Sequence, residues 1–286
     1  MKRNFRKYLI WFFGLCLVLL ILGVWIYFLL NQKNDLKVFF FDVGQGDASL
    51  IRTPDGKNIL IDGGPDEKIL SSLSEALPWW DRLIDLIILT HPHDDHIVGL
   101  VTVLKKYRVK QVLQTGVKYS TPSNSVWLQD LAKKNIKTNI VKQPQEINLG
   151  PDCSLKILYP FQLLSGIEIK NLNNSSIVSR LDCEGEEVLF MGDAEKEVEA
   201  ELLVVYSDLK SKIIKTGHHG SETASTEEFL LAVDPEKAII SVGEGNKFGL
   251  PDLRILRRLE RLGIEIFRTD EDGAIVLEKD TITKKQ

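Results

Sequence analysis

The chain has 286 residues, 27% of them charged and 44% hydrophobic, which is enough for one large domain or two small ones with a sizeable core. The first 31 residues contain four basic and no acidic residues, so the other 32 basic and 40 acidic residues give positions 32–286 a formal charge of about −8. This acidity argues against a broad basic groove for duplex nucleic acid, although a local basic patch is compatible with it.

The N-terminus has the pattern of a membrane anchor. Basic residues at positions 2, 3, 6 and 7 precede an uncharged run of 23 residues, 8–30, which as a helix would reach about 34 Å. The basic residues predict a cytoplasmic N-terminus. Residues 1–31 would form a cytoplasmic tip and transmembrane helix, with a folded domain over 32–286 outside the cytoplasm. A cleaved signal peptide is the alternative, but no small-x-small cleavage site follows the run.

Hydrophobic periodicity and turn residues predict alternating strands and helices beyond residue 35. Strands are expected at 36–42, 48–53, 58–62, 84–89, 109–113, 138–142, 155–159, 176–182, 188–191, 212–215, 238–242, 265–269 and 274–278. Helices are expected at 67–77, 97–107, 126–134, 194–206, 226–232 and 251–262. The order favours two sheets flanked by helices in one α/β domain.

Polar residues follow five of the predicted strands directly. They form the clusters 42–47 (DVGQGD), 62–64 (DGG), 91–96 (HPHDDH), 192–193 (GD) and 217–221 (GHHGS). Loops at one edge of a sheet sandwich converge, and catalytic groups gather on loops held by a rigid scaffold.

The cluster at 91–96 is the most specific of the five. It holds three of the chain's five histidines, with two aspartates between them, immediately after an apolar strand. Imidazole and carboxylate groups at this spacing are typical of a metal site. A polar loop that is histidine-rich by chance is the weaker interpretation.

Taken in order, these clusters resemble the metallo-β-lactamase superfamily of metal hydrolases. Residues 91–96 match its HxHxDH motif, and Asp193 matches its later bridging aspartate. The sequence is most similar to the hydrolase domain of ComEC-type competence proteins and to phosphorylcholine esterases. The shared segments are DVGQGD at 42–47, NNSS at 173–176, GDA at 192–194, HHGS at 218–221 and GNKFGLP at 245–251. The resemblance implies an αββα sandwich of two mixed sheets flanked by helices.

The resemblance also implies a two-zinc centre, with Mn²⁺ as the alternative metal. A centre of this kind lowers the pKa of a bound water toward ~7. His91 and His93 would bind the first ion, Asp95 and His96 the second, and Asp193 both. One histidine of the pair 218–219 would complete the second site, and we favour His218.

The catalytic roles would then fall to Asp95, Asp193 and His219, with His219 turned toward substrate. The motif residues expected to contact substrate are Asn173, Asn174, Ser176, Ser221 and Asn246. Asp94 would either orient a ligand histidine or be an exposed carboxylate.

Two departures from the wider pattern bear on the substrate. No histidine lies between His96 and His218, whereas many superfamily members have a third first-site histidine there. This weakens a β-lactamase interpretation more than a metal-site interpretation. Leu250 stands where the ComEC-like pattern usually has histidine.

The predicted function is therefore hydrolysis of a phosphodiester by a membrane-anchored, extracytoplasmic, metal-dependent enzyme linked to competence. Single-stranded nucleic acid and envelope phosphorylcholine are the two expected substrates, and no obligate protein partner is evident. A channel lined by Lys215, Lys247 and Arg268 could guide a strand. The alternative is a degenerate member that binds metal or a partner with little turnover.

Two smaller features remain open or point to the core. Cys153 and Cys183 either pair in a disulfide or remain free buried thiols, because spacing alone does not decide. Trp79 and Trp80 are expected to pack against the nearby sheet.

Overall fold

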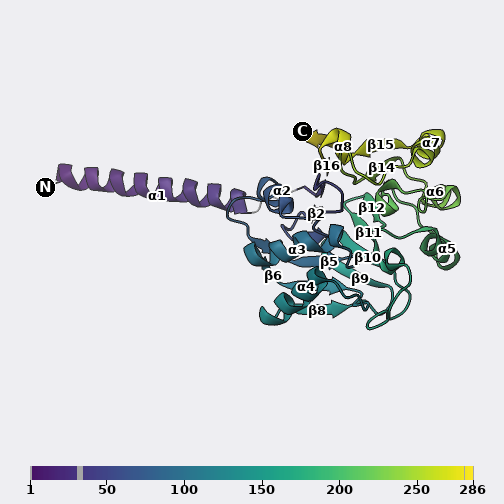
Figure 1. The fold of residues 1–286 in the computed structure, drawn as a ribbon. Helices are drawn as coiled ribbons and strands as arrows, with labels where there is room; N and C mark the ends of the chain where they lie inside the picture. Colours follow the sequence, from purple (N-terminus) through teal and green to yellow (C-terminus); the bar gives the residue numbers. More distant parts are fainter. Residues whose placement is uncertain (1, 31–34, 280, 286) are drawn as a thin grey trace. The chain divides into compact units, whose positions relative to one another are not determined.

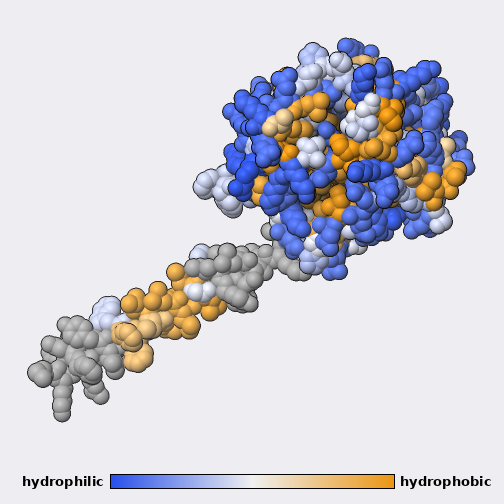
Figure 2. All heavy atoms as spheres, turned by 90° about the horizontal axis from the view of Figure 1, so that it is seen from below, coloured by the Kyte–Doolittle hydropathy of each residue, from blue (hydrophilic) through white to orange (hydrophobic). Residues whose placement is uncertain are grey.

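The chain divides into two compact units, Met1–Asn34 and Asp35–Gln286, in a computed structural model that describes residues 2–30, 35–279 and 281–285. The first unit holds a single helix, α1 (Lys2–Leu30). Its described side chains, from residue 11 to residue 25, are largely apolar and exposed (Figure 2). Among the described residues, no helix is long and apolar enough to cross a membrane, so the predicted anchor is not supported.

Two mixed sheets form the centre of the second unit (Figure 1). Within its described residues, eight strands make the first sheet, in the order β17-β16-β1-β2-β3-β5-β7-β8, and seven make the second, in the order β15-β14-β13-β12-β11-β10-β9. The first sheet comprises β1 (Lys37–Phe40), β2 (Ser49–Arg52), β3 (Asn58–Ile61), β5 (Leu86–Leu89), β7 (Gln111–Gln114), β8 (Lys137–Ile140), β16 (Ala274–Glu278) and β17 (Thr281–Lys285). The second comprises β9 (Gln145–Gly150), β10 (Cys153–Tyr159), β11 (Val178–Cys183), β12 (Glu186–Phe190), β13 (Ile213–Lys215), β14 (Lys237–Ile240) and β15 (Glu265–Arg268). A separate pair joins β4 (Leu83–Ile84) to β6 (Arg108–Val109).

Helices cover the outer faces of both sheets. Those of the second unit are α2 (Lys68–Ala76), α3 (Asp94–Lys106), α4 (Pro122–Lys133), α5 (Lys196–Val205), α6 (Glu227–Val233), α7 (Leu253–Arg261) and the short α8 (Thr269–Asp272). Leu73, Leu100 and Trp127 bury the faces of α2, α3 and α4 in one core, and helices α5 to α7 bury theirs in another. The predicted two mixed sheets flanked by helices are confirmed.

A third core fills the space between the sheets. It consists of apolar side chains on the inner faces of both, and the rings of Phe40 on β1 and Phe190 on β12 lie 5.9 Å apart across it. Inward-facing residues recur at every second position, as a half-buried strand requires. This core holds the two sheets in fixed register with each other.

The strand directions bring the polar clusters together. β3, β5, β7 and β8 run parallel to one another, and so do β12, β13, β14 and β15. Ligand sites in such sheets form at the carboxyl ends of the strands. The polar clusters that follow β3, β5, β12 and β13 lie at the carboxyl ends of these strands.

The helix after the histidine cluster begins earlier than predicted, at residue 94 in place of 97. Asp94 and Asp95 occupy its first turn, where carboxylates interact favourably with the helix dipole. His96 is therefore a helical residue, whereas His91 and His93 precede the helix. The strands β4, β6, β9 and β17 were not predicted.

Cys153 and Cys183 form a disulfide between neighbouring positions of β10 and β11, which settles the question left open by their spacing. Trp79 and Trp80 are 80% and 69% exposed, so the prediction that they pack against the sheet is wrong. They are the two central residues of a turn that is closed by a hydrogen bond from the Asp81 N–H to the Pro78 carbonyl.

Candidate metal centre

Two groups of potential ligands meet between the carboxyl ends of the two sheets, and they share one aspartate. The ligand atoms of each group lie within 4.8 Å of one another. The first group is His91, His93 and Asp193, and the second is Asp95, His96, Asp193 and His219. Asp193, the residue predicted to bind both ions, belongs to both groups.

The nitrogen and oxygen atoms of these groups face one another at short range. His96 Nε2 lies 3.4 Å from Asp193 Oδ1, and His91 Nε2 lies 3.7 Å from Asp193 Oδ2. His219 Nε2 lies 3.3 Å from Asp95 Oδ2 and 3.7 Å from Asp193 Oδ2.

Three of these atoms are buried without a hydrogen-bond partner within the described residues. They are His96 Nε2, His219 Nε2 and Asp193 Oδ1. Leaving such groups unsatisfied is costly, so each one in a folded protein needs an explanation. Imidazole nitrogens and carboxylate oxygens that converge in this way fit a divalent cation.

His219, not His218, completes the second group, which reverses the preference drawn from the sequence. Both residues have left-handed backbone conformations, with φ of 46° for His218 and 53° for His219, and their rings contact different carboxylates. His218 Nδ1 lies 3.1 Å from Glu195 Oε1 and 3.1 Å from the Thr223 hydroxyl. His218 is 28% exposed in its side chain, whereas His219 is buried.

The far side of the His219 ring is held by two acceptors. Its Nδ1 lies 2.9 Å from the carbonyl oxygen of Ser241 and 3.3 Å from Asp47 Oδ1. A proton on Nδ1 satisfies these oxygens and leaves Nε2 free to act as a ligand. The environment thus selects the tautomer that a metal site requires.

Asp62 plays the corresponding part for His96. Its Oδ2 lies 2.8 Å from His96 Nδ1, and its two oxygens also accept hydrogen bonds from the Thr90 N–H and hydroxyl at 2.8 and 2.6 Å. The sequence placed Asp62 among the polar clusters without giving it a role. Its position directly after a buried strand was the signal that pointed to it.

Close backbone contact holds the helix of His96 against the loop of Asp62. The Gly99 N–H donates to the Gly64 carbonyl at 2.9 Å, and the Gly63 N–H donates to the His96 carbonyl at 2.8 Å. A Cβ on Gly99 would lie 1.8 Å from the Gly63 carbonyl oxygen. Only glycine permits this approach.

Lys215 forms a buried ion pair with Asp47, which the sequence did not predict. The lysine is only 2% exposed, so it does not line a channel for substrate. Arg268 is also engaged, with Asp270 and Glu271. Of the three cations expected along a channel, Lys247 is the exposed one.

The pKa values reflect an excess of carboxylates in this cluster. Burial lowers the pKa of His219, but the charges of Asp193 and Asp47 outweigh it and raise the pKa to about 10. Burial and the neighbouring His96 hold the pKa of His91 well below its ordinary value. Burial raises the pKa of Asp47, yet the charges of Lys215 and His219 leave it below its usual range. The carboxylates of this cluster therefore favour the addition of positive charge, such as that of a cation, between them.

Two residues expected to contact substrate lie beside His218. Asn173 Nδ2 donates to Glu195 Oε1 at 2.9 Å and lies 3.4 Å from the ring nitrogens of His218. Asn174 accepts a hydrogen bond from the Glu195 N–H at 3.0 Å and donates to the Glu197 carboxylate at 3.1 Å. Glu195 therefore organises this corner, and sequence reasoning missed it.

The other three predicted substrate residues have different settings. Ser176 is buried, accepts a hydrogen bond from the Asp193 N–H at 3.1 Å and lies 3.3 Å from His91 Nδ1, so it supports the ligands. Ser221 shares a hydrogen bond with a neighbouring threonine hydroxyl at 3.1 Å. Asn246 donates to two carbonyls of its own loop, 243–250, and fixes its shape.

The contacts of Asp94 and Leu250 show what these two side chains do. Asp94 is exposed and bonded to Ser123, so it does not orient a ligand histidine. Leu250 packs, partly buried, against the core beneath the second sheet.

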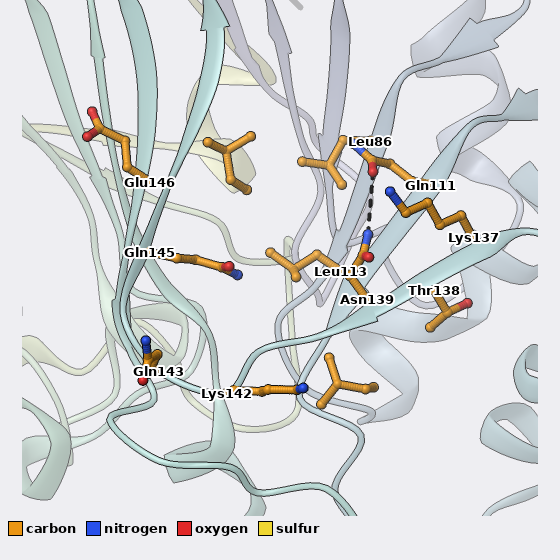
Figure 3. A pocket seen from close by; sticks show the side chains of 12 residues that line it. Leu86, Gln111, Leu113, Lys137, Thr138, Asn139, Lys142, Gln143, Gln145 and Glu146 are labelled. Atoms are coloured by element: carbon orange, nitrogen blue, oxygen red, sulfur yellow. Dashed lines mark hydrogen bonds between the residues drawn. The ribbon is translucent and has the colours of Figure 1, made fainter.

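A cavity of about 880 Å³ lies away from this cluster, between the edge strands β8 and β9 of the two sheets (Figure 3). Leucine and isoleucine side chains form part of its lining, with glutamines and lysines around them. Glu146 is the one carboxylate among the described residues that line it, so its donor set does not suit a metal ion.

Comparisons with known proteins agree with this geometry. The chain is 30% identical to ComE operon protein 3 of Bacillus subtilis over 92% of its own length and 35% of that protein. It is 32% identical to Recombination protein 2 of Haemophilus influenzae, over 85% of this chain and 29% of that protein. The chain thus spans about a third of the length of these relatives.

Solved structures support the fold at much lower identity. The metallo-β-lactamase fold protein YhfI from Bacillus subtilis is 13% identical with a TM-score of 0.56, covering 85% of this chain and all of that one. Zn²⁺-bound PqqB from Methylobacterium extorquens is 12% identical with a TM-score of 0.52, covering 85% of this chain and 99% of that one.

The family model described as the metallo-beta-lactamase superfamily matches residues 41–244, well over half of the chain. These residues include every ligand of the two groups described above. The chain therefore belongs to the metallo-β-lactamase superfamily, whose members are typically metal-dependent hydrolases.

Proposed function

We propose that the chain is a phosphodiesterase that uses two divalent cations, Zn²⁺ or alternatively Mn²⁺. The observation that carries this proposal is the pair of ligand groups that share Asp193 and contain buried ring nitrogens without partners. His91, His93 and Asp193 would hold one ion, and Asp95, His96, Asp193 and His219 the other. When bound, such ions activate water and neutralise charge that develops on a phosphoryl oxygen.

His218 is the residue of this chain best placed to handle a proton at the mouth of the site. Its side chain is partly exposed and its Nδ1 lies against the Glu195 carboxylate at 3.1 Å. A carboxylate on one ring nitrogen orients the imidazole and favours a proton on it. In the imidazolium form of His218, Nδ1 keeps its proton toward Glu195 while Nε2 carries the second proton, which it can donate to the departing oxygen of the substrate, and Asn173 is placed to contact the phosphate.

Two observations favour a phosphodiester as the substrate: the set of metal ligands and the names of the relatives. No histidine lies between His96 and His218, so the first group lacks a third histidine. The names of two relatives, Recombination protein 2 and Competence protein ComA of Neisseria gonorrhoeae, point to nucleic acid. Because residues 32–286 are acidic, we propose a single strand in preference to a duplex. Phosphorylcholine esters are the second substrate class.

The test is hydrolysis by the purified full chain of bis(p-nitrophenyl) phosphate, single-stranded DNA and a phosphorylcholine ester, compared side by side. We expect EDTA to abolish turnover and added Zn²⁺ or Mn²⁺ to restore it. Asp193→Ala should lose both metal and turnover, whereas Asp208→Ala, at an exposed carboxylate elsewhere, should retain both. Bound metal without turnover on any phosphodiester would show a binding protein in place of an enzyme.

We also propose that residues 8–30 hold the chain at a membrane with residues 35–286 outside the cytoplasm. The uncharged run in the sequence supports the first part, and the Cys153–Cys183 disulfide fits an oxidising compartment. Protease added to intact cells should digest the second unit if this topology is right. Full protection until the cells are lysed would contradict it.

A further inference from the structure

An exposed edge of the second unit combines two tryptophans with a cluster of cations. Trp79 and Trp80 form the tip of a turn, with rings 5.5 Å apart and nearly perpendicular. Large aromatic side chains exposed to this extent are uncommon on a soluble surface and often mark an interaction site.

Cations lie next to this turn because β4, which follows it, pairs in parallel with β6. Leu83 pairs with Arg108, and the Arg108 N–H donates to the Arg82 carbonyl at 2.9 Å. This ladder places Arg82 beside the segment 105–110 (KKYRVK), which contains four basic residues and no acidic one. We use the name basic edge for Trp79, Trp80, Arg82, Lys105, Lys106 and Arg108.

The cations of the basic edge are available to a partner. Arg82, Lys105, Lys106 and Arg108 are all exposed, and the Arg82 guanidinium also donates to the Tyr107 hydroxyl at 3.0 Å. The neighbouring acids Asp81 and Asp85 accept hydrogen bonds from Asn58, and Asp85 is also bridged by Lys110 at 2.5 Å. Glu75, at the end of α2, is an exposed acid on the approach to the turn. Lys133, Lys134 and Lys137 extend the positive surface across the end of α4 and the start of β8.

The position of the basic edge in the sheet argues for its partner. It lies where β5, β7 and β8 begin, whereas the metal centre lies where β3, β5, β12 and β13 end. β1 runs in the same direction as β3, because both are antiparallel to β2. Asp35, which precedes β1, therefore enters the second unit on the same side of the sheet as the basic edge, and the apolar run 8–30 comes just before it in the sequence.

We propose that the basic edge seats the second unit on an anionic lipid surface. Tryptophan side chains favour the headgroup region of a bilayer, and each nearby lysine or arginine adds about fivefold to binding of anionic lipid. This inference rests on the proposed membrane location. It directs the metal centre away from the lipid, so that substrate reaches the centre from the aqueous side.

The test compares hydrogen exchange of the full chain on vesicles of phosphatidylcholine alone and of phosphatidylcholine mixed with phosphatidylglycerol. We expect residues 77–85 and 104–110 to be protected only when phosphatidylglycerol is present, and high salt to remove the protection. Lys105→Glu, Lys106→Glu and Arg108→Glu together should weaken docking on the order of a hundredfold and remove the exchange protection. Trp79→Ser with Trp80→Ser should also reduce it.

A matched variant controls for net charge. Lys170→Glu, Lys196→Glu and Arg257→Glu together change the charge equally at exposed sites elsewhere and should keep the protection. Equal exchange on both kinds of vesicle would overturn the proposal, and so would protection that requires a single-stranded oligonucleotide in place of phosphatidylglycerol. Hydrolysis of bis(p-nitrophenyl) phosphate by the same variants in detergent should be unchanged, which separates this inference from the proposed activity.

Discussion

Two adjacent histidines serve different purposes in this chain. His219 is buried, its Nδ1 faces oxygen acceptors, and its Nε2 faces Asp95 and Asp193. His218 is partly exposed and paired with Glu195. We expect His219→Ala to lower the bound metal content, because it removes a ligand. His218→Ala should keep the metal and lower kcat by about 10²–10⁴-fold, the usual contribution of an acid–base group.

Metal content measured by plasma mass spectrometry separates the two variants without reference to activity. Glu195→Gln should also keep the metal and lower kcat, since it removes the carboxylate that contacts Nδ1 of the His218 ring. If His218→Ala lost metal while His219→Ala kept it, the ligand order drawn from the structure would be reversed.

The buried pair of Lys215 and Asp47 makes a second residue-level prediction. Removing one partner leaves a buried charge without compensation, so Lys215→Met should destabilise the fold by about 3–5 kcal/mol. The double variant Asp47→Asn with Lys215→Met should recover part of this loss, because no unpaired charge remains. Urea unfolding of the three proteins measures both effects, and equal stability of the single and double variants would contradict the pairing.

Residue roles were predictable from sequence only where spacing determined them. The HxHxDH spacing identified His91, His93, Asp95 and His96, which the structure brings together. The choice between His218 and His219 depends on two successive left-handed residues, and no pattern in the sequence reveals these backbone angles. Lys215 looked like a channel residue because its charge is visible in the sequence and its buried partner, 168 positions away, is not.

At the scale of elements, one glutamate joins two helices on the outer face of the second sheet. The Glu199 carboxylate on α5 accepts hydrogen bonds from the Ser225 and Thr226 N–H groups at 2.5 and 2.9 Å. Thr226 is also the N-cap of α6, where its hydroxyl accepts a bond from the Phe229 N–H at 3.4 Å. Burial raises the pKa of Glu199, which is largely enclosed between the helices.

Glu199→Ala should therefore cost about 2–4 kcal/mol, because two enclosed N–H groups lose their acceptor. Glu201→Ala, on the exposed face of the same helix, should cost less than about 0.5 kcal/mol. Chemical denaturation gives both values. Similar costs for the two variants would mean that Glu199 does not join α5 to α6.

Element prediction succeeded where apolar residues recur with a clear period. The strands predicted at 176–182 and 188–191 are present as the antiparallel pair β11 and β12, and all six predicted helices of the second unit are present with shifted ends. β4 and β6 have two residues each, too few to establish a period. β9 is mostly exposed, so it lacks the alternation that marks a half-buried strand.

At the scale of the whole molecule, the order of strands within the sheets could not be read from periodicity. β16 pairs with β1 across more than two hundred residues of sequence, and β15 lies at the far edge of the other sheet. The resemblance to a known family implied this sandwich, whereas composition and periodicity alone led only to two sheets flanked by helices. The convergence of the polar clusters was nevertheless correct, because it depends on strand direction and not on strand order.

The metal centre spans the two sheets, which gives the last prediction. Asp95 and His96 come from the side of the first sheet, and Asp193 and His219 follow β12 and β13 of the second. Ions held by this group would bind the folded chain and not the unfolded one. Removing each ion should therefore lower the free energy of unfolding by about 3 kcal/mol when the free metal had been at a hundred times its Kd.

Calorimetry of the full chain, with and without EDTA, measures this shift as a fall in Tm. The Asp193→Ala variant supplies the control, since it disrupts both ligand groups and should unfold at the same Tm in either condition. Zn²⁺ added back should restore the Tm of the natural chain alone. A Tm that ignores EDTA in the natural chain would mean that the carboxylates and imidazoles between the sheets are satisfied without a cation, and the assignment of a metal centre would fail.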